Sequence, residues 1–337
     1  MMRTSSWVIA IGLTLLMTGA DAALLAALPH LGLSFGPIWF PLACLAFVRI
    51  FFYFAWLSIR RNLTDWLRWS TIIAPNLFLS GLALYAFAIE PFQPGITRLE
   101  IATHNPPVQP LHILHLSDLH IERITPRERE ILFQVAEMQP DLIVLTGDFL
   151  STSNLNDPLS WQETRWFLNH LHAPFGVYAV NGNIDSPLTM RVLFEGLPIR
   201  VLDDEVEALQ LPDRMLYLIG VSHQGLERDR TALKTLSGNI PPGATRVLLY
   251  HTPDLIETAA AEGIHLYLAG HTHGGQIRLP FYGAVLTLSV YGKQYEKGHY
   301  TVGATHLYVS RGIGMEGWIA PRVRFLCPPE MVEITLH

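Results

Sequence analysis

The sequence predicts an α/β protein in which two β-sheets form a sandwich flanked by helices, preceded by an all-α transmembrane region. Residues 111–337 alternate short apolar, β-branched runs with helical segments and become rich in Gly and strand formers after Gly274. Residues 1–90 hold most of the apolar excess: half of the 337 residues are hydrophobic and only 15% are charged, against roughly 25% in a typical soluble domain. We therefore expect a transmembrane region over 1–90, a linker over 91–110 and a globular domain over 111–337.

Three apolar stretches predict helices that cross a bilayer, over residues 6–28, 38–59 and 70–89. Each has close to the roughly 20 residues that a helix needs to span the hydrocarbon core. Asp21 and Arg49 are the only charged side chains within them. Since a charge inside a membrane is costly and usually faces a partner, we expect an interhelical ion pair. The alternative is that each side chain reaches separately toward headgroups or water.

The first stretch has a second interpretation, as a cleaved signal peptide. Arg3 supplies a positive n-region, residues 7–17 an apolar segment, and residues 20–22 (Ala-Asp-Ala) a small-residue cleavage site. The apolar residues 24–28 continue beyond that site and favour an uncleaved helix.

The loops between the stretches predict the orientation. Arg60, Arg61 and Arg68 lie between the second and third, whereas residues 30–37, between the first and second, contain no Lys or Arg. Under the positive-inside rule the Arg-rich loop is cytoplasmic. The chain is then a multi-pass protein of the cell (inner) membrane, with its globular domain outside the cytoplasm.

The later elements follow from local patterns. Residues 91–110 are rich in Pro and lack periodicity, which is typical of a linker. Helical patterns cover 126–139 and 156–170, the second with Trp161, Phe167 and Leu168 on its buried face. The expected strands are 112–116, 142–145, 177–180, 247–249, 266–268, 305–309 and 331–336.

Five of these strands end in polar side chains that suit a metal site. The segments are Asp118-Leu119-His120, Gly147-Asp148, Gly182-Asn183, Tyr250-His251 and Gly270-His271-Thr272-His273. A side chain that follows a strand is held on rigid backbone at the sheet edge, so five such ends can converge on one point. Asp, His and Asn without Cys suit divalent ions such as Mn, Fe, Zn or Mg.

The order of these segments resembles the calcineurin-like metallophosphoesterases over roughly residues 110–337. The wording "HLSDLH", "GHTHGGQIRLP" and "YVSRGIG", with a terminal "CPPEMVEITL", is similar to the membrane-anchored bacterial phosphodiesterases of that superfamily. The resemblance implies a metallophosphoesterase-type sandwich and two divalent metal ions. It assigns Asp118, His120 and His273 to the first ion, Asn183, His251 and His271 to the second, and Asp148 to both. Asp148, Asn183 and His251 are also the expected catalytic residues.

Two divalent ions about 3.5–4 Å apart clamp a phosphoryl group and activate the water between them, which becomes the attacking hydroxide. A shared carboxylate, here Asp148, offsets the repulsion between the ions. One position departs from the family pattern: most members have His after Gly-Asn, credited with protonating the leaving group, and this chain has Ile184. Either the protein is catalytically silent, or its leaving group needs no acid. We favour the second because all seven ligands are present.

Two further residues are candidate substrate contacts. His223 follows a strand-like run and is a candidate to line the site and supply a proton, and Arg311 is a candidate to contact the substrate phosphate. The alternative for both is an ordinary structural or solvated role.

Residues 91–337 hold 18 Lys and Arg against 26 Asp and Glu, so no basic stripe is present for nucleic acid. No protein partner is inferred.

The function expected from the sequence is a membrane-anchored dimetal phosphoesterase that hydrolyses a phosphodiester or phosphoanhydride, with a phosphorylated small molecule or a lipid-type substrate. One alternative is the superfamily enzyme that hydrolyses UDP-2,3-diacylglucosamine in lipid A synthesis. That enzyme also tolerates a non-His residue after Gly-Asn, but its reaction is cytoplasmic, in conflict with the predicted orientation. The other alternative is a silent membrane scaffold or sensor that binds metal.

Overall fold

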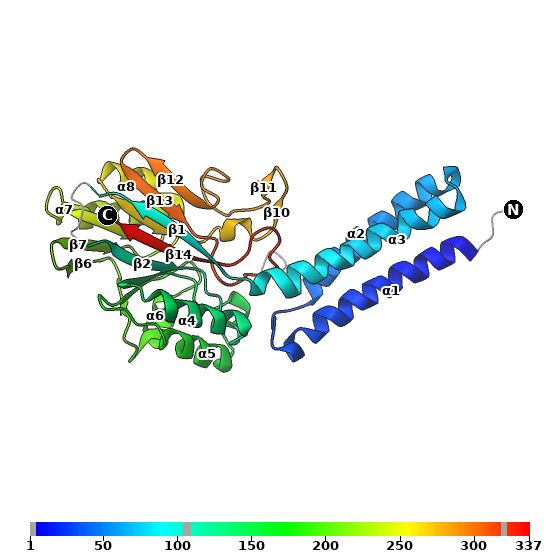
Figure 1. Ribbon diagram of the computed structural model, residues 1–337, viewed down its shortest axis with the longest axis horizontal. Helices are drawn as coiled ribbons and strands as arrows, with labels where there is room; N and C mark the ends of the chain where they lie inside the picture. Colours follow the sequence, from blue (N-terminus) through cyan, green and yellow to red (C-terminus); the bar gives the residue numbers. More distant parts are fainter. Residues whose placement is uncertain (1–4, 104–108, 318–321) are drawn as a thin grey trace.

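Three long helices form a bundle at the N-terminal end of the computed structural model, which describes residues 5–103, 109–317 and 322–337 (Figure 1). They are α1 (Ser5–Ala27), α2 (Trp39–Ile59) and α3 (Asp65–Leu84). α3 continues through the π-helical η3 (Tyr85–Ile89) into the 3-10 turn η4 (Glu90–Phe92). All three are long and apolar enough to cross a membrane. The three predicted helices are confirmed, although α3 begins at Asp65 rather than at residue 70.

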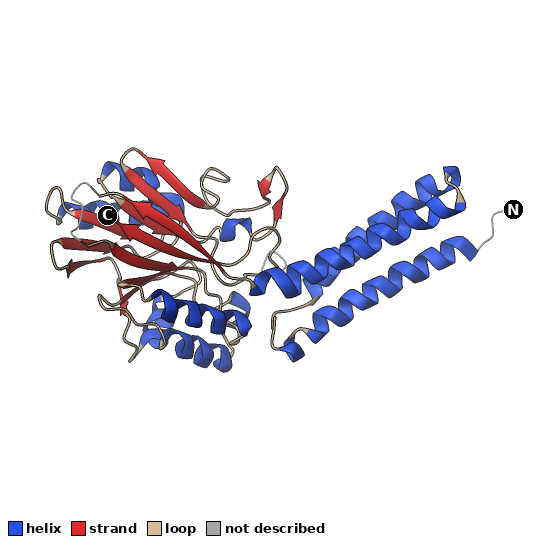
Figure 2. Ribbon diagram, viewed as in Figure 1, coloured by secondary structure: helices blue, strands red, loops and turns tan. Residues whose placement is uncertain are grey.

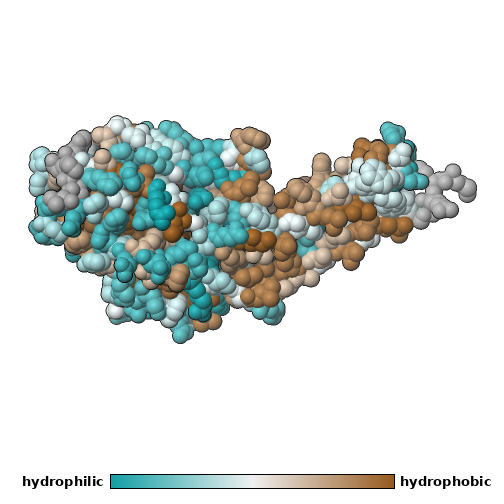
Figure 3. All heavy atoms as spheres, viewed as in Figure 1, coloured by the Kyte–Doolittle hydropathy of each residue, from teal (hydrophilic) through white to brown (hydrophobic). Residues whose placement is uncertain are grey.

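The bundle turns apolar side chains outward and polar ones inward. Trp39, Phe47 and Phe51 of α2 are largely exposed, and hydrophobic atoms cover much of the visible bundle surface (Figure 3). Such a surface is stable only in contact with apolar surroundings such as lipid.

Asp21 and Arg49 form the expected interhelical ion pair. The Arg49 guanidinium donates to Asp21 Oδ2 at 2.5 and 3.0 Å, to Asn76 Oδ1 at 2.6 Å and to Ser80 Oγ at 2.7 Å. Ser80 in turn donates to Asp21 Oδ1 at 2.8 Å. The cluster joins all three helices, and α1 supplies its only carboxylate among the described contacts. This tie makes α1 an integral part of the bundle.

The remainder is a two-sheet sandwich with helices outside both sheets, as predicted (Figure 2). The first sheet has the order β1-β14-β2-β3-β4-β5, with β14 antiparallel to β2 and the other pairs parallel. Its strands are β1 (Gly95–Ile101), β2 (Leu111–Leu116), β3 (Leu142–Thr146), β4 (Val177–Val180), β5 (Arg200–Val201) and β14 (Glu330–Leu336). The helices α4 (Pro126–Met138), α5 (Pro158–Leu168) and α6 (Pro187–Phe194) pack on its outer face.

The second sheet has the order β12-β13-β9-β8-β7-β6. Its strands are β6 (Glu205–Gln210), β7 (Met215–Gly220), β8 (Thr245–Leu249), β9 (Leu266–Ala269), β12 (Gly298–Val302) and β13 (Thr305–Val309). Helices α7 (Leu226–Gly238) and α8 (Ile256–Ala261) cover its outer face. Side chains such as Val144, Val180, Leu218 and Leu249 fill the space between the sheets and are fully buried. A short hairpin, β10 (Arg278–Leu279) and β11 (Gly283–Ala284), projects beside the bundle (Figure 1).

Residues 91–110 are not a simple linker. Seven of them form β1, which pairs in parallel with β14 from Gly95–Glu330 to Ile101–Leu336. The pairing is between segments more than two hundred residues apart in the sequence, so local composition gave no sign of it. The globular unit therefore begins near Gly95, and residues 104–108 of the predicted linker lie outside the described residues.

The bundle is joined to the sandwich by both polar and apolar contacts. The Glu90 carboxylate accepts from the backbone N–H groups of Leu326 and Cys327. Leu28 and Phe87 pack against Val323 in a shared apolar cluster. These contacts set the sandwich at the end of the bundle opposite η2 (Arg60–Asn62) (Figure 1).

Candidate metal centre

Seven side chains with metal-binding chemistry lie just past the ends of five central strands. Parallel neighbours in a sheet end at the same edge, so the residues that follow them are brought together. Asp118 and His120 follow β2, Asp148 follows β3, Asn183 follows β4, His251 follows β8, and His271 and His273 follow β9. Both sheets therefore contribute to one site at the edge of the sandwich.

Five of the seven have left-handed backbone, with φ of 50° at Asp118, 40° at His120, 57° at Asp148, 69° at His271 and 51° at His273. Positive φ is uncommon for residues other than Gly and costs about 1–3 kcal/mol each. Such strain is typical of functional sites, where the surrounding fold holds side chains in place.

Two glycines allow the loops to approach closely enough. A Cβ at Gly182 would overlap the Asp148 carboxylate, and one at Gly270 would overlap Ser117 and the Asp118 carboxylate. Both positions therefore require Gly for steric reasons rather than for flexibility.

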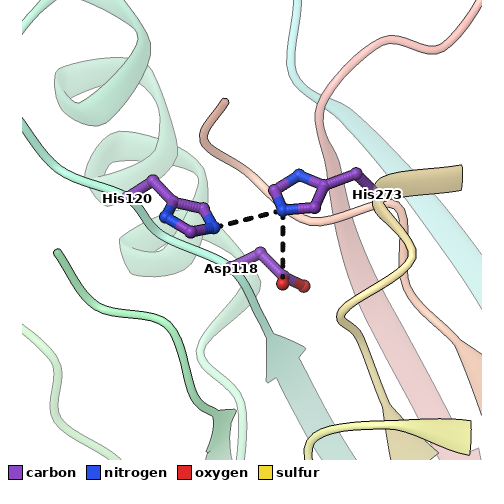
Figure 4. Close-up of side chains that lie close together, drawn as sticks. All are labelled: Asp118, His120 and His273. Carbon is purple, nitrogen blue, oxygen red and sulfur yellow. Dashed lines mark hydrogen bonds and ion pairs between the residues drawn. The ribbon is translucent and has the colours of Figure 1, made fainter. Parts of the chain in front are cut away.

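The first group of donors contains Asp118, His120 and His273 (Figure 4). The two Nε2 atoms of the histidines lie 3.1 Å apart, and His273 Nε2 lies 3.6 Å from Asp118 Oδ1. The Asp118 carboxylate also accepts from the His271 backbone N–H at 3.0 Å, which ties the loop after β2 to the loop after β9.

The second group contains Asp148, His251 and His271. Asn183 Oδ1 lies 2.9 Å from His251 Nε2 and 2.8 Å from His271 Nδ1, and these two nitrogens are 3.2 Å apart. Asn183 Oδ1 therefore lies within contact distance of both histidines of this group.

Asp148 lies between the two groups. Its Oδ2 is 3.3 Å from His251 Nε2 and 3.7 Å from His120 Nε2. Its Oδ1 accepts from the Ile184 backbone N–H at 3.1 Å. One carboxylate thus reaches donors of both groups, which is the position a bridging ligand needs.

Backbone carbonyl groups orient two of the histidine rings. His120 Nδ1 lies 3.3 Å from the Leu150 carbonyl and His251 Nδ1 lies 2.7 Å from the Thr146 carbonyl. A carbonyl only accepts, so each Nδ1 carries a proton and each Nε2 is directed toward the group. Partners of this kind are typical of metal-binding histidines.

The electrostatics of the site also fit cations. Burial lowers the pKa of both His271 and His273. The neighbouring His251 adds to the effect on His271, and His120 adds to the effect on His273. Both imidazoles are therefore neutral and able to bind a metal. Burial lowers the pKa of His251 too, but the Asp148 carboxylate outweighs it and raises the pKa to about 10. Burial raises the pKa of Asp148, yet His251 and His120 more than reverse this and keep it ionised. A divalent ion can replace the proton on His251, since metal binding to histidine releases protons.

Asp185 supports the site and was not singled out from the sequence. Its carboxylate accepts from the backbone N–H groups of Asp148 at 2.6 Å, Gly182 at 2.8 Å and Phe149 at 3.3 Å. Burial and the Asp148 charge raise its pKa to about 6. The G-N-x-D spacing was the available signal, because Asp185 lies two residues after Asn183.

The two candidate substrate contacts have different surroundings. The His223 ring centroid lies 6.1 Å from that of His251, and its Nδ1 lies 3.0 Å from Tyr250 Oη. The guanidinium of Arg311 instead pairs with Glu330 at 3.0 Å. His223 therefore lies at the rim of the second group, whereas Arg311 has a structural partner.

Comparison with known proteins agrees with this geometry. The family model described as calcineurin-like phosphoesterase matches residues 111–275. The metallophosphoesterase YkuE of Bacillus subtilis is 33% identical over 233 residues, covering 66% of this chain and 78% of the relative. The chain belongs to the calcineurin-like phosphoesterase family. Members are metal-dependent, and this phosphoesterase has the two Asp and His groups that such chemistry needs.

Two further relatives have more specific names. The phosphodiesterase YaeI of Escherichia coli is 28% identical to this phosphoesterase over 261 residues, covering 75% of this chain and 92% of the relative. The UDP-2,3-diacylglucosamine pyrophosphatase LpxG of Chlamydia trachomatis is 26% identical over 276 residues, covering 66% of this chain and 82% of the relative.

Proposed function

We propose that this protein is a membrane-anchored dimetal phosphoesterase that hydrolyses a phosphodiester or phosphoanhydride of an amphiphilic, lipid-type substrate. The observation that carries the proposal is the pair of donor groups that share Asp148 at one edge of the sandwich. Asp118, His120 and His273 would hold one divalent ion, Asn183, His251 and His271 the other, and Asp148 both. When bound, two such ions polarise a phosphoryl group and lower the pKa of water toward neutrality.

The side chains around the site favour a leaving group that departs without a proton. Ile184 occupies the position of the family's acid and has no proton to give. Tyr250 donates its hydroxyl proton to Asp229 at 2.7 Å, so its oxygen accepts from His223 Nδ1. Burial, with His251 adding to it, lowers the pKa of His223, so at neutral pH the ring keeps one proton and directs it toward Tyr250.

A phosphoanhydride or an aryl ester has such a leaving group, because phosphate and aryl oxides are weaker bases than alkoxides. The named substrate of the relative LpxG is a lipid linked to a nucleotide through an anhydride. Hydrolysis of a compound of that class is the second candidate function.

The anchor supports a lipid-type substrate, because three apolar helices would hold the site close to a bilayer. In support of an extracytoplasmic sandwich, η2, which contains Arg60 and Arg61, and the first turn of α3, which contains Arg68, join α2 to α3. This connection lies at the end of the bundle away from the sandwich (Figure 1). The same orientation argues against a cytoplasmic reaction.

Turnover by the metal-reconstituted full-length protein tests the proposal. The panel contains bis(p-nitrophenyl) phosphate, a dialkyl phosphate and a UDP-linked diacylated sugar, each assayed with Mn, Fe, Zn and Mg. We expect metal-dependent hydrolysis of the aryl ester and the anhydride, and loss of that activity together with the second ion in His251→Ala. Two bound ions without turnover of any compound would instead identify a metal-binding scaffold.

A further inference from the structure

A continuous apolar segment follows the last metal-binding motif and remains outside the core. Residues 279–292 contain no charged side chain. Seven large apolar side chains within this segment are between about half and fully exposed: Leu279, Phe281, Tyr282, Val285, Leu286, Leu288 and Val290. In the other described parts of the sandwich, exposed side chains of this kind are scattered over several elements.

The base of the segment is fixed. Arg278 donates to the Glu296 carboxylate at 2.6 Å and to the Gly274 carbonyl at 2.8 Å. Glu296 also accepts from the Ala284 backbone N–H at 3.1 Å, and Thr287 donates to the Gly292 carbonyl at 2.7 Å. The apolar side chains are therefore held outward by a hydrogen-bonded frame, and their exposure is part of the fold.

The segment lies on the side of the sandwich that faces the helical bundle. The β10–β11 hairpin projects from the domain beside the start of the bundle (Figure 1), and hydrophobic atoms cover its visible end (Figure 3). Arg278 precedes the uncharged stretch and Lys293 follows it. Lys293 Nζ lies 3.5 Å from the centroid of the Tyr282 ring. Arg278 is paired with Glu296, so Lys293 is the cation that flanks the stretch. An apolar stretch that ends at a cation is typical of segments that enter the headgroup region of a bilayer.

The segment also reaches the metal centre. His271 Nε2 lies 3.3 Å from the Leu288 carbonyl, while its Nδ1 faces Asn183 in the second group. The carbonyl can only accept, so Nε2 carries the proton and Leu288 fixes the ring that offers Nδ1. Nearby, Ser289 donates to Asp254 at 2.6 Å. One end of the apolar segment is thus a direct neighbour of a candidate metal ligand.

We propose that residues 279–290 enter the interface of the bilayer that the three helices span, and that they admit a lipid phosphoester from that bilayer to the second metal position. The inference rests on the proposed function, which supplies the membrane and the phosphoester. A lipid would keep its acyl chains against the apolar side chains while its phosphate lies beside His271. Lipid then covers the exposed apolar side chains of residues 279–290. A water-soluble ester can reach the metal position without contacting these side chains.

A depth measurement tests insertion without using activity. The full chain in phosphatidylcholine–phosphatidylglycerol vesicles, with Cys44→Ser, carries an environment-sensitive dye at Phe281→Cys. Its control carries the dye at Phe133→Cys, another exposed phenylalanine position, which lies on α4. We expect a blue shift and quenching by spin-labelled lipid at position 281 and neither at 133. Water-like emission at both positions would overturn the inference.

A kinetic comparison tests delivery. Two substrates share a p-nitrophenyl leaving group, bis(p-nitrophenyl) phosphate and the p-nitrophenyl ester of a diacylglycerol phosphate in the same vesicles. In the double variant Phe281→Ser/Val285→Ser we expect the ratio of turnover of the lipid ester to turnover of the soluble ester to fall by about tenfold or more. That factor corresponds to losing the transfer of one large apolar side chain from water into an apolar environment. An equal loss on both esters, or no loss, would contradict delivery by the segment. If the wild type cleaves neither ester, the proposed function fails while the depth measurement still decides insertion.

Discussion

Ile184 is the residue that most directly shapes the chemistry of this site. Its backbone N–H holds Asp148 Oδ1 at 3.1 Å, so the position contributes to the metal centre through its main chain. Its side chain is apolar and only partly buried. The position thus keeps its structural contact while offering no acid.

Ile184→His should change the dependence of rate on the leaving group. General acid catalysis contributes ~10²–10⁴-fold and matters most when the departing oxygen is a strong base. The wild-type kcat should therefore fall steeply across a series of phosphodiesters as leaving-group pKa rises, and the His variant should flatten that slope by accelerating alkyl esters. Ile184→Leu is the matched control. A flat slope in the wild type, with chemistry rate-limiting, would point to another proton donor, and His223 would be examined first.

Among the elements, β14 owes its position to a buried carboxylate at its first residue. Glu330 accepts from Tyr308 Oη at 2.9 Å, from the Arg311 guanidinium at 3.0 Å and from Thr97 on β1. Burial raises the pKa of Glu330, but Arg311 outweighs it and the net pKa is lowered below 4.5. One side chain therefore holds β1, β13 and β14 together.

Glu330→Gln should lower the free energy of unfolding at pH 7 by about 1.5–3 kcal/mol, the range for hydrogen bonds to a charged group. Because the folded pKa is depressed, the stabilisation from the carboxylate is complete above pH 4.5 and is lost as pH falls through the lower folded pKa. Denaturant titrations of both proteins in detergent between pH 3 and 7 should show that the difference in free energy of unfolding between wild type and variant becomes smaller toward pH 3. The reason is that protonation removes the charge of Glu330. A difference that stays constant with pH would mean that the charge of Glu330 is irrelevant.

In the bundle, removal of Arg49 should be severe. Breaking a buried ion pair by deleting one partner costs about 3–5 kcal/mol, because the other charge stays buried. Arg49→Leu should therefore lower the thermal midpoint in detergent strongly, and adding Asp21→Asn should restore part of the loss. The exposed Arg61→Leu is the control. Equal midpoints for Arg49→Leu and Arg61→Leu would show that the cluster does not stabilise the bundle.

The elements also show which features could be predicted from sequence. Runs such as 142–145 followed by Gly147-Asp148 combine a strand signal and a ligand signal within a few residues, so the centre could be predicted locally. β1 could not, because its partner β14 lies at the other end of the chain and its own burial pattern is irregular. Asn76 and Ser80 were missed for a related reason. Each is an ordinary polar residue until the packing of three helices places it beside Arg49.

At the scale of the whole molecule, the bundle and the sandwich have a defined relation. The connection between α1 and α2 approaches the sandwich through Phe35, whose N–H donates to Glu122 at 3.1 Å. The Arg-rich connection between α2 and α3 lies at the far end (Figure 1). With the three helices across a membrane, the side on which Arg60 and Arg61 lie would decide the compartment of the metal centre.

A reporter fused after His337 tests that compartment. Alkaline phosphatase should be active and a fluorescent cytoplasmic reporter dark, because the arginines hold their own loop inside. The same pair of reporters inserted after Arg61 should give the opposite result. An inactive alkaline phosphatase together with a fluorescent cytoplasmic reporter at position 337 would place the site in the cytoplasm. That result would favour hydrolysis of a UDP-linked lipid.

The central claim is that one carboxylate serves two metal ions that perform the chemistry, and Asp148→Asn tests it most directly. The amide keeps the shape of the side chain and its contact with Ile184, but it removes the charge that both groups share. Metal content per chain and turnover of bis(p-nitrophenyl) phosphate are measured on the wild type, on Asp148→Asn and on the exposed control Asp213→Asn. We expect two ions in the wild type and the control. In Asp148→Asn we expect at most one ion and a loss of at least about 100-fold in rate, since even the partners of metal ligands contribute 10–100-fold. Two ions per chain and full activity in Asp148→Asn would contradict the assignment.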